Sequence, residues 1–87
     1  MKFTDLKVNK VDRFSVGIEE DSGDYYVSIP VANSYVDYEE HYGISSDAFH
    51  EFCLDMAKAL PFVQKCREQK NDHLLIQSPG KSRGVSQ

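Results

Sequence analysis

The stretch RFSVGIEEDSGDYYVSIPVA, residues 13–32, decides the fold class. Apolar and polar residues alternate in its first part, residues 13–20, and again in its last part, residues 25–32. An alternation of period two is typical of strands that bury one face. The link between the two parts is acidic and contains Gly23, which predicts a turn. The stretch therefore predicts an antiparallel hairpin with one apolar face, made by Phe14, Val16, Ile18, Tyr25, Val27, Ile29 and Val31.

A third strand is expected to follow the hairpin over residues 35–42, after a turn at Asn33–Ser34. Its even-numbered side chains would share one face and its odd-numbered side chains the other, since the side-chain period of a strand is two. The first face then carries Val36, Tyr38, Glu40 and Tyr42, and the second carries Tyr35, Asp37 and Glu39. Leu6 and Val8 indicate a further strand near the N-terminus. Pro30 has no amide hydrogen to donate, so it is expected at a sheet edge, at a bulge, or at a position whose amide faces away from the neighbouring strand. It argues against an uninterrupted central ladder.

From Ile44 onward the apolar period changes from two to 3.6, which predicts an amphipathic helix. Ser45 or Ser46 is expected to cap its N-terminus. Pro61 is expected to break the helix or to begin a second helical segment. The buried stripe of the first segment would be Phe49, Phe52, Cys53, Met56 and Leu60, and that of the second Phe62, Val63 and Cys66.

The C-terminal part is expected to hold one more short apolar element and then a tail. We predict that Leu74–Ile76 is a last strand, with an apolar plug over the core as the alternative. Residues 78–87 are small, polar or basic without periodicity, and we expect a flexible tail. The predicted fold is thus an α+β domain, residues 1–77, in which an antiparallel sheet of three to five strands packs against one long or Pro-broken C-terminal helix pair.

The size of the chain leaves room for one hydrophobic core. With 87 residues, of which 40% are hydrophobic and 28% charged, it has the composition of a small globular protein. Cys53 and Cys66 are expected to be reduced and to act as small core residues. The N-terminal residues carry no apolar signal segment, and no run is apolar enough to span a membrane. We therefore expect a cytoplasmic protein.

Charge is sorted along the chain. Residues 1–13 carry a net charge of +2, residues 14–57 a net −10 with no Lys or Arg, and residues 58–87 a net +4. All five tyrosines fall in the acidic stretch. Tyrosine is enriched at binding hot spots, and carboxylates around it would steer a basic partner. Phosphates would be repelled, so direct nucleic-acid binding is not expected. Some of the rings would instead belong to the core.

These observations predict a protein-binding surface on the acidic meander. The residues expected to contact the partner are Tyr26, Tyr35, Asp37, Tyr38, Glu39, Glu40, His41 and Tyr42. Neither catalytic residues, nor metal ligands, nor a cofactor are expected, since the phosphate-binding and nucleotide-binding motifs are missing from the sequence.

Two other classes of function remain open at this point. A small metal-dependent or thiol enzyme could use Asp37, Glu39 and His41, which lie on one face of the third strand, or His50 with Cys53. A regulatory subunit or a homodimer could pair through an edge of the sheet. The oligomeric state does not follow from the sequence.

The stretches YYVSIPVANSYVDYEEHYGIS, residues 25–45, and LPFVQKCREQKNDHLLI, residues 60–76, with the closing SRG, resemble a group of small uncharacterised bacterial proteins. In general character the chain is similar to immunity proteins of contact-dependent and other polymorphic toxin systems, which are small, acidic and without catalytic groups. This resemblance implies a protein partner, a basic toxin domain such as a nuclease, and it implies no particular contact residue.

Overall fold

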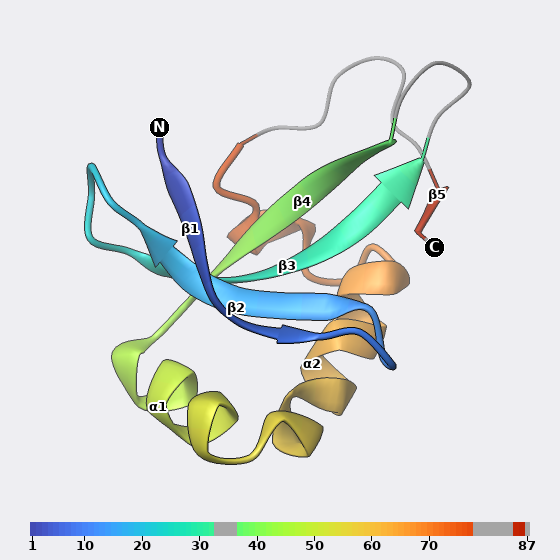
Figure 1. Ribbon diagram of the computed structural model, residues 1–87. Helices are drawn as coiled ribbons and strands as arrows, with labels where there is room; N and C mark the ends of the chain where they lie inside the picture. The colour runs from blue at the N-terminus through green and yellow to red at the C-terminus, as the bar shows by residue number, and fades with distance from the viewer. Residues whose placement is uncertain (33–36, 78–84, 87) are drawn as a thin grey trace.

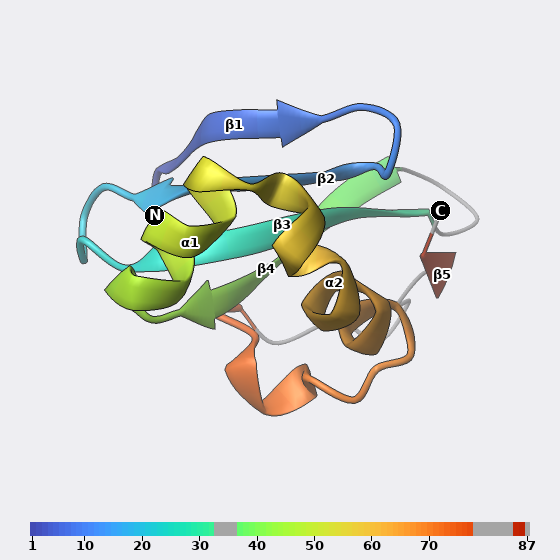
Figure 2. The same cartoon turned by 90° about the horizontal axis from the view of Figure 1, so that it is seen from below.

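The fold is a single antiparallel sheet with both helices on one of its faces, an α+β arrangement as predicted (Figures 1 and 2). The computed structural model describes residues 1–32, 37–77 and 85–86. Four strands lie side by side in chain order: β1 (Phe3–Asn9), β2 (Phe14–Glu19), β3 (Tyr25–Ala32) and β4 (Asp37–Ile44). A two-residue strand, β5 (Val85–Ser86), pairs with the end of β3.

The predicted strands are found with shifted ends. The hairpin of residues 13–32 forms β2 and β3, with Val16 opposite Val27. The third predicted strand, residues 35–42, corresponds to β4, which runs on to Ile44, the residue from which a helical period was predicted. The predicted turn at Asn33–Ser34 lies outside the described residues, as does the predicted tail except for β5.

Pro30 lies within β3 at a position where one neighbouring strand is missing. The pairing of β2 with β3 covers Tyr25–Ser28 only, and Pro30 lies beyond it, opposite Glu39 of β4. A residue without an amide hydrogen is tolerated where no ladder bond is required on that side. The expectation that Pro30 avoids an uninterrupted central ladder is therefore confirmed.

The helical region is broken at Asp55, six residues before the predicted break at Pro61. Ser45 caps α1 (Ser46–Leu54), its hydroxyl accepting a hydrogen bond from the Ala48 amide at 3.1 Å. Asp55 then adopts an extended conformation, φ −149°, and its carboxylate accepts from the Ala57 amide at 3.1 Å. Aspartate competes with the helical backbone in this way, so it ends helices more readily than the apolar period suggests.

Two short helical elements follow α1. A 3₁₀ turn, η1 (Met56–Ala59), connects to α2 (Leu60–Arg67), where Pro61 occupies the first turn as expected of a helix-starting proline. The single predicted stripe from Phe49 to Leu60 is therefore divided over three elements, and α1 is shorter than predicted.

The prediction that Leu74–Ile76 forms a strand is wrong. Asp72–Leu74 is a 3₁₀ turn, η2, and Leu75 makes one isolated bridge to Tyr42 at the edge of β4. The Ile76 amide also donates to the His41 carbonyl at 2.9 Å, so the segment follows the strand edge for only two residues. Leu74 and Leu75 pack against the core, which agrees with the alternative of an apolar plug.

The main core lies between the sheet and the helices. Its sheet side holds the predicted alternating residues Phe14, Val16, Val27, Ile29 and Val31 with Tyr42, and its helix side holds Phe49, Phe52, Ala59, Val63 and Cys66. Each of these residues is at most 8% exposed. The apolar period of the sequence therefore gives the correct face of both strands.

Candidate functional site

The face of the sheet opposite the helices is the candidate binding surface. We call it the open face, and its residues are Phe3, Asp5, Ser15, Tyr26, Ser28, Pro30, Asp37, Glu39 and His41. The antiparallel register sets these residues in rows across the strands, with Ser15 beside Ser28 and Ser28 beside His41. Since side chains of one strand alternate between faces, Asp37, Glu39 and His41 of β4 share the open face, as the sequence predicts.

Three rings and one carboxylate form a compact cluster on the open face. The His41 ring stacks on Phe3 with ring centres 3.7 Å apart, and Tyr26 meets both rings edge-on, with centres 4.8 Å and 5.4 Å away. The Tyr26 hydroxyl donates a hydrogen bond of 2.6 Å to Asp5. Burial lowers the pKa of His41, with Asp5 opposing the effect, and raises the pKa of Tyr26, where Asp5 adds to it. Both rings are therefore neutral at pH 7.

Gly17 makes room for this cluster. A Cβ at this position would overlap the Thr4 carbonyl oxygen and would lie 2.7 Å from Cζ of Tyr26. Tyr26 is fully buried although it lies on the face away from the helices, because β1 and its Phe3 close over it. A bulge between Asp5 and Lys7 bends β1, and the first part of β1 lies over the open face of the hairpin. The open face thus has a small core of its own, made by β1.

Glu39 is an exposed carboxylate of the open face. Ser28 donates to its carboxylate at 3.4 Å, and partial burial together with the nearby charge of Asp5 raises its pKa. Among the residues that the structure describes, no Lys or Arg forms an ion pair with it. An acid that is partly desolvated and that no described residue neutralises is stabilised by an external cation.

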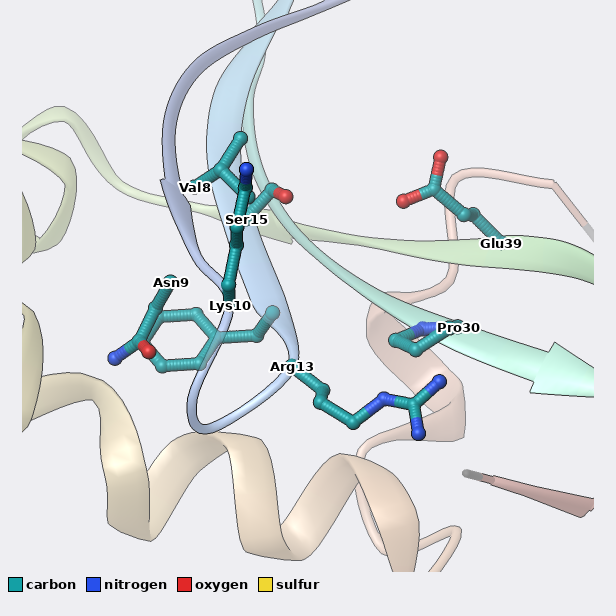
Figure 3. Close-up of a pocket in the computed structure, with 8 residues that line it drawn as sticks. Val8, Asn9, Lys10, Arg13, Ser15, Pro30 and Glu39 are labelled. Carbon is teal, nitrogen blue, oxygen red and sulfur yellow. The ribbon is translucent and has the colours of Figure 1, made fainter.

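A pocket of about 220 Å³ opens beside Glu39 (Figure 3). It lies between the β1–β2 turn and the strands β3 and β4. Its walls are formed by Val8, Asn9, Lys10, Arg13, Phe14, Ser15, Pro30 and Glu39. The pocket therefore combines apolar side chains with two cations on one wall and a carboxylate on the other.

The predicted contact residues do not all reach the surface. Tyr26, Glu40 and Tyr42 are buried, at 0%, 6% and 0% exposure, so the prediction that they contact a partner is wrong for their side chains. The Tyr42 hydroxyl donates to Glu40 at 2.8 Å and lies 3.3 Å from the Cys66 carbonyl, on the helix-covered face. A buried carboxylate and a buried hydroxyl satisfy one another here.

The remaining predicted contact residues differ in exposure. Asp37 and Glu39 are exposed, and His41 is half-buried in the ring cluster. Tyr38 is half-buried and packs against the main core. Tyr35 lies outside the described residues. The surface part of the predicted set is therefore Asp37 and Glu39 with one side of His41.

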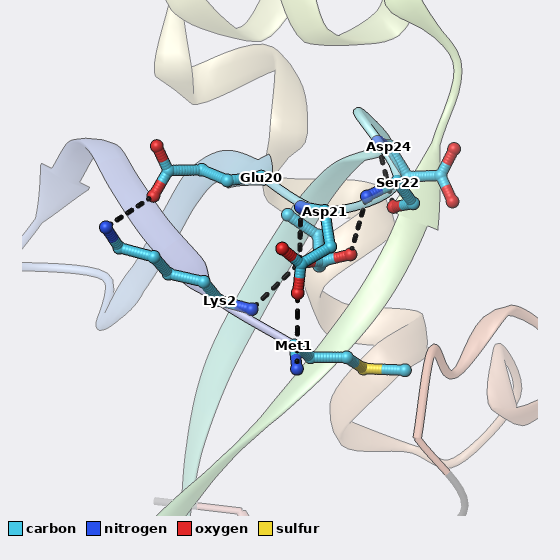
Figure 4. A network of polar contacts seen from close by, with 7 residues as sticks. Met1, Lys2, Glu20, Asp21, Ser22 and Asp24 are labelled. Atoms are coloured by element: carbon cyan, nitrogen blue, oxygen red, sulfur yellow. Dashed lines mark hydrogen bonds and ion pairs between the residues drawn. The ribbon is translucent and has the colours of Figure 1, made fainter.

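Several acids of the β2–β3 turn hold the N-terminus in place. Glu19 accepts backbone hydrogen bonds from Lys2, Asp21 and Ser22, at 2.8 Å, 3.0 Å and 3.0 Å, and these bonds lower its pKa to about 2. Glu20 pairs with the Lys2 ammonium at 3.3 Å, and Asp21 pairs with the N-terminal amine at 3.4 Å (Figure 4). These carboxylates contribute to the fold, so the acidic stretch offers fewer binding charges than its sequence indicates.

The described residues do not form either of the alternative chemical sites, a metal site or a thiol–imidazole pair. Within residues 1–32, 37–77 and 85–86 no three His, Cys, Asp or Glu side chains are grouped so that they could hold a metal ion. His50 is exposed and Cys53 half-buried on α1, and the described contacts include no hydrogen bond between them. Burial raises the pKa of the Cys66 thiol to about 11, which keeps it protonated at neutral pH.

Comparisons with protein family models, with curated proteins and with solved structures gave no match to this chain. Of the helices in the described part, none is long and apolar enough to cross a membrane.

Proposed function

We propose that this protein is a protein-binding module without catalytic activity of its own, which presents the open face to a basic partner. The more specific proposal is an immunity protein that acts in the bacterial cytoplasm and neutralises a toxin domain, such as a nuclease. It is carried by one observation: the carboxylate of Glu39 is exposed, has no cationic partner within the described residues, and lies beside the half-exposed rings of Phe3 and His41.

An aromatic and acidic surface of this kind suits recognition of Lys or Arg side chains. The rings supply contact area that is already rigid, so little conformational entropy is lost on binding. The carboxylate steers a basic partner during approach and fixes its register in the complex. The size of the interface can be compared with the total surface of this small protein. A standard interface of about 800 Å² per partner would occupy about 15% of the accessible surface of 5369 Å².

The arrangement of acids disfavours nucleic acid as the direct ligand of this face. Asp5, Asp37 and Glu39 all belong to it or to its rim. Phosphate binding requires a continuous set of Lys and Arg, and Lys2 and Lys70 of the basic ends are already paired with Glu20 and Glu68. The partner is therefore proposed to be a protein.

A second candidate, a homodimer that pairs through β1, is favoured by the edge of the sheet. β1 ends the strand order, and its Leu6 and Val8 are 53% and 55% exposed. An unprotected edge strand with apolar side chains is a template for pairing with a second strand. Light scattering discriminates the two candidates, since a dimer that dissociates in a Leu6→Lys variant would support edge pairing.

The proposed function is tested by capture of partners from native lysate at low and high salt, followed by mass spectrometry. We expect one basic protein, retained in stoichiometric amount at low salt and less at high salt, because exposed charge pairs are screened. A Glu39→Lys variant should lose it, while the matched control Glu51→Lys, an exposed acid on α1, should retain it. Equal retention by both variants, or no specific protein at either salt, would contradict the proposal.

A further inference from the structure

The pocket beside Glu39 contains two opposite charges that do not neutralise one another. Lys10 forms no hydrogen bond or ion pair with any residue that the structure describes. Glu39 likewise forms no ion pair with any described residue. Both side chains nevertheless line the same pocket, from the β1–β2 turn and from β4 (Figure 3). Two side chains of opposite charge that line one pocket without touching each other can each pair with a group of the opposite charge on a single ligand.

The wall that carries Lys10 is held in a fixed conformation. Asn9 bonds to Asp12 twice, its side chain accepting from the Asp12 amide at 2.9 Å and donating to the Asp12 carboxylate at 3.0 Å. Arg67 of α2 donates to the Asp12 carbonyl and, at 3.4 Å, to the Arg13 carbonyl. Arg13 has φ 58°, a left-handed conformation that is uncommon for residues other than glycine. Such strain is maintained only where the surroundings determine it.

The dimensions of the pocket restrict the ligand to a small molecule. A volume of about 220 Å³ lies below the range of about 300–1,000 Å³ that is typical of sites for drug-sized ligands. Liquid water takes about 30 Å³ per molecule, so the space corresponds to about seven waters, enough for an amino acid. Val8 and Pro30 supply apolar contacts for a short carbon chain, and Ser15 supplies a hydroxyl.

We propose that this pocket binds a small zwitterion of amino-acid size, with its carboxylate at Lys10 and its ammonium at Glu39. The apolar wall of Val8 and Pro30 contacts the carbon chain between the two charged groups. The raised pKa of Glu39 supports this assignment, because a cation brought next to the carboxylate would relieve the cost of its ionisation. The inference does not rest on the proposed protein partner, since it concerns a free small molecule.

The test is a titration of the ¹⁵N-labelled full chain followed by NMR. The probes are glycine, 4-aminobutyrate and 6-aminohexanoate, which are zwitterions of increasing charge separation, with butyrate and butylamine as matched probes that carry one charge each. At least one zwitterion should shift the amide signals of Asn9, Ser15 and Glu39 in a saturable manner. Its apparent Kd should be about tenfold lower than that of either singly charged probe, which corresponds to one additional bond to a charged group.

Variants separate the two ends of the site. Lys10→Gln and Glu39→Gln each remove one charge and should each weaken binding of that zwitterion by about tenfold, to the level of the singly charged probes. Glu51→Gln, on the exposed side of α1, should bind as the unchanged protein does. The proposal is overturned if no zwitterion gives saturable shifts at these amides, if the singly charged probes bind equally well, or if the same amides respond only to a captured partner protein.

Discussion

Glu39 and Glu40 are adjacent in β4, and the alternation of the strand places their side chains on opposite faces of the sheet. Glu40 is 6% exposed and accepts a hydrogen bond from Tyr42 inside the main core. Glu39 is exposed and faces the pocket. A glutamate is thus part of the fold on the helix-covered face, and a glutamate next to it is part of the proposed binding site on the open face. The residue type does not distinguish these roles. The position of the residue in the strand does, because alternate residues face opposite sides of the sheet.

The largest loss of stability is expected from a substitution at Gly17, which supports the open face. Alanine at this position would force β1 and the Tyr26 ring apart, and we expect a loss of about 3 kcal/mol or more in the free energy of unfolding. Gly43 is the matched control, because it pairs with the other side of Tyr26 and a Cβ there would lie 3.6 Å from its nearest neighbour. Urea denaturation of both variants measures the difference. Equal stability of the two would show that β1 does not close over Tyr26.

Glu40→Ala and Glu39→Ala test the two faces of the sheet within one strand. Removal of Glu40 leaves a cavity and takes the acceptor of the Tyr42 hydroxyl, so we expect a loss of about 2–3 kcal/mol. Glu39→Ala should change the free energy of unfolding by less than about 0.5 kcal/mol, as exposed substitutions do. Chemical denaturation at pH 7 checks both values. A large loss in Glu39→Ala would mean that the open face is structural.

Tyr26 and Tyr25 provide a smaller effect of the same kind. Tyr26→Phe removes the 2.6 Å hydrogen bond to Asp5 and should cost about 1 kcal/mol. Tyr25 lies on the helix-covered face, its ring stacks on Phe49 with centres 4.1 Å apart, and none of the described contacts involves its hydroxyl. Tyr25→Phe should therefore be close to neutral. A reversed order in thermal unfolding would contradict the hydrogen bond to Asp5.

The smallest expected effect is a pH dependence that originates at His41. Burial lowers its pKa in the folded state, while Asp5 opposes this. The unfolded chain therefore binds a proton first, so stability falls as the pH is lowered from about 6.5 through the folded pKa. In His41→Gln the stability between pH 7 and pH 5.5 should fall less steeply, and His50→Gln on α1 serves as control. An unchanged slope in His41→Gln would show that His41 does not titrate differently in the folded state.

The strand pairing and the apolar face of the hairpin could be predicted because a half-buried strand leaves a period-two pattern in the sequence. The same pattern placed Glu40 on the side of Tyr38 and Tyr42, so its burial could have been inferred. The sequence alone nevertheless favours a surface charge at Glu40, because an acid is rarely buried unless it is hydrogen-bonded. The hydroxyl of Tyr42 is the partner that makes this burial tolerable.

Other features depend on contacts between distant segments and leave no local pattern. Tyr26 is buried because β1 crosses over it, which requires Gly17 and Phe3 together. The break at Asp55 replaces a continuous helix because its carboxylate bonds to the next turn. Lys10 and Glu39 line the same pocket although they are 29 positions apart in the sequence. A local periodic pattern does not predict that two such distant residues lie close together.

Association kinetics of Glu39→Lys with the captured partner test whether the open face is the binding surface. We expect a slower association rate and a flatter salt dependence than in the unchanged protein. We also expect an unfolding free energy within about 0.5 kcal/mol of that protein, and unchanged kinetics in Glu51→Lys. Association of Glu39→Lys at the rate of the unchanged protein would show that the open face is not the binding surface and place the contact elsewhere on the chain.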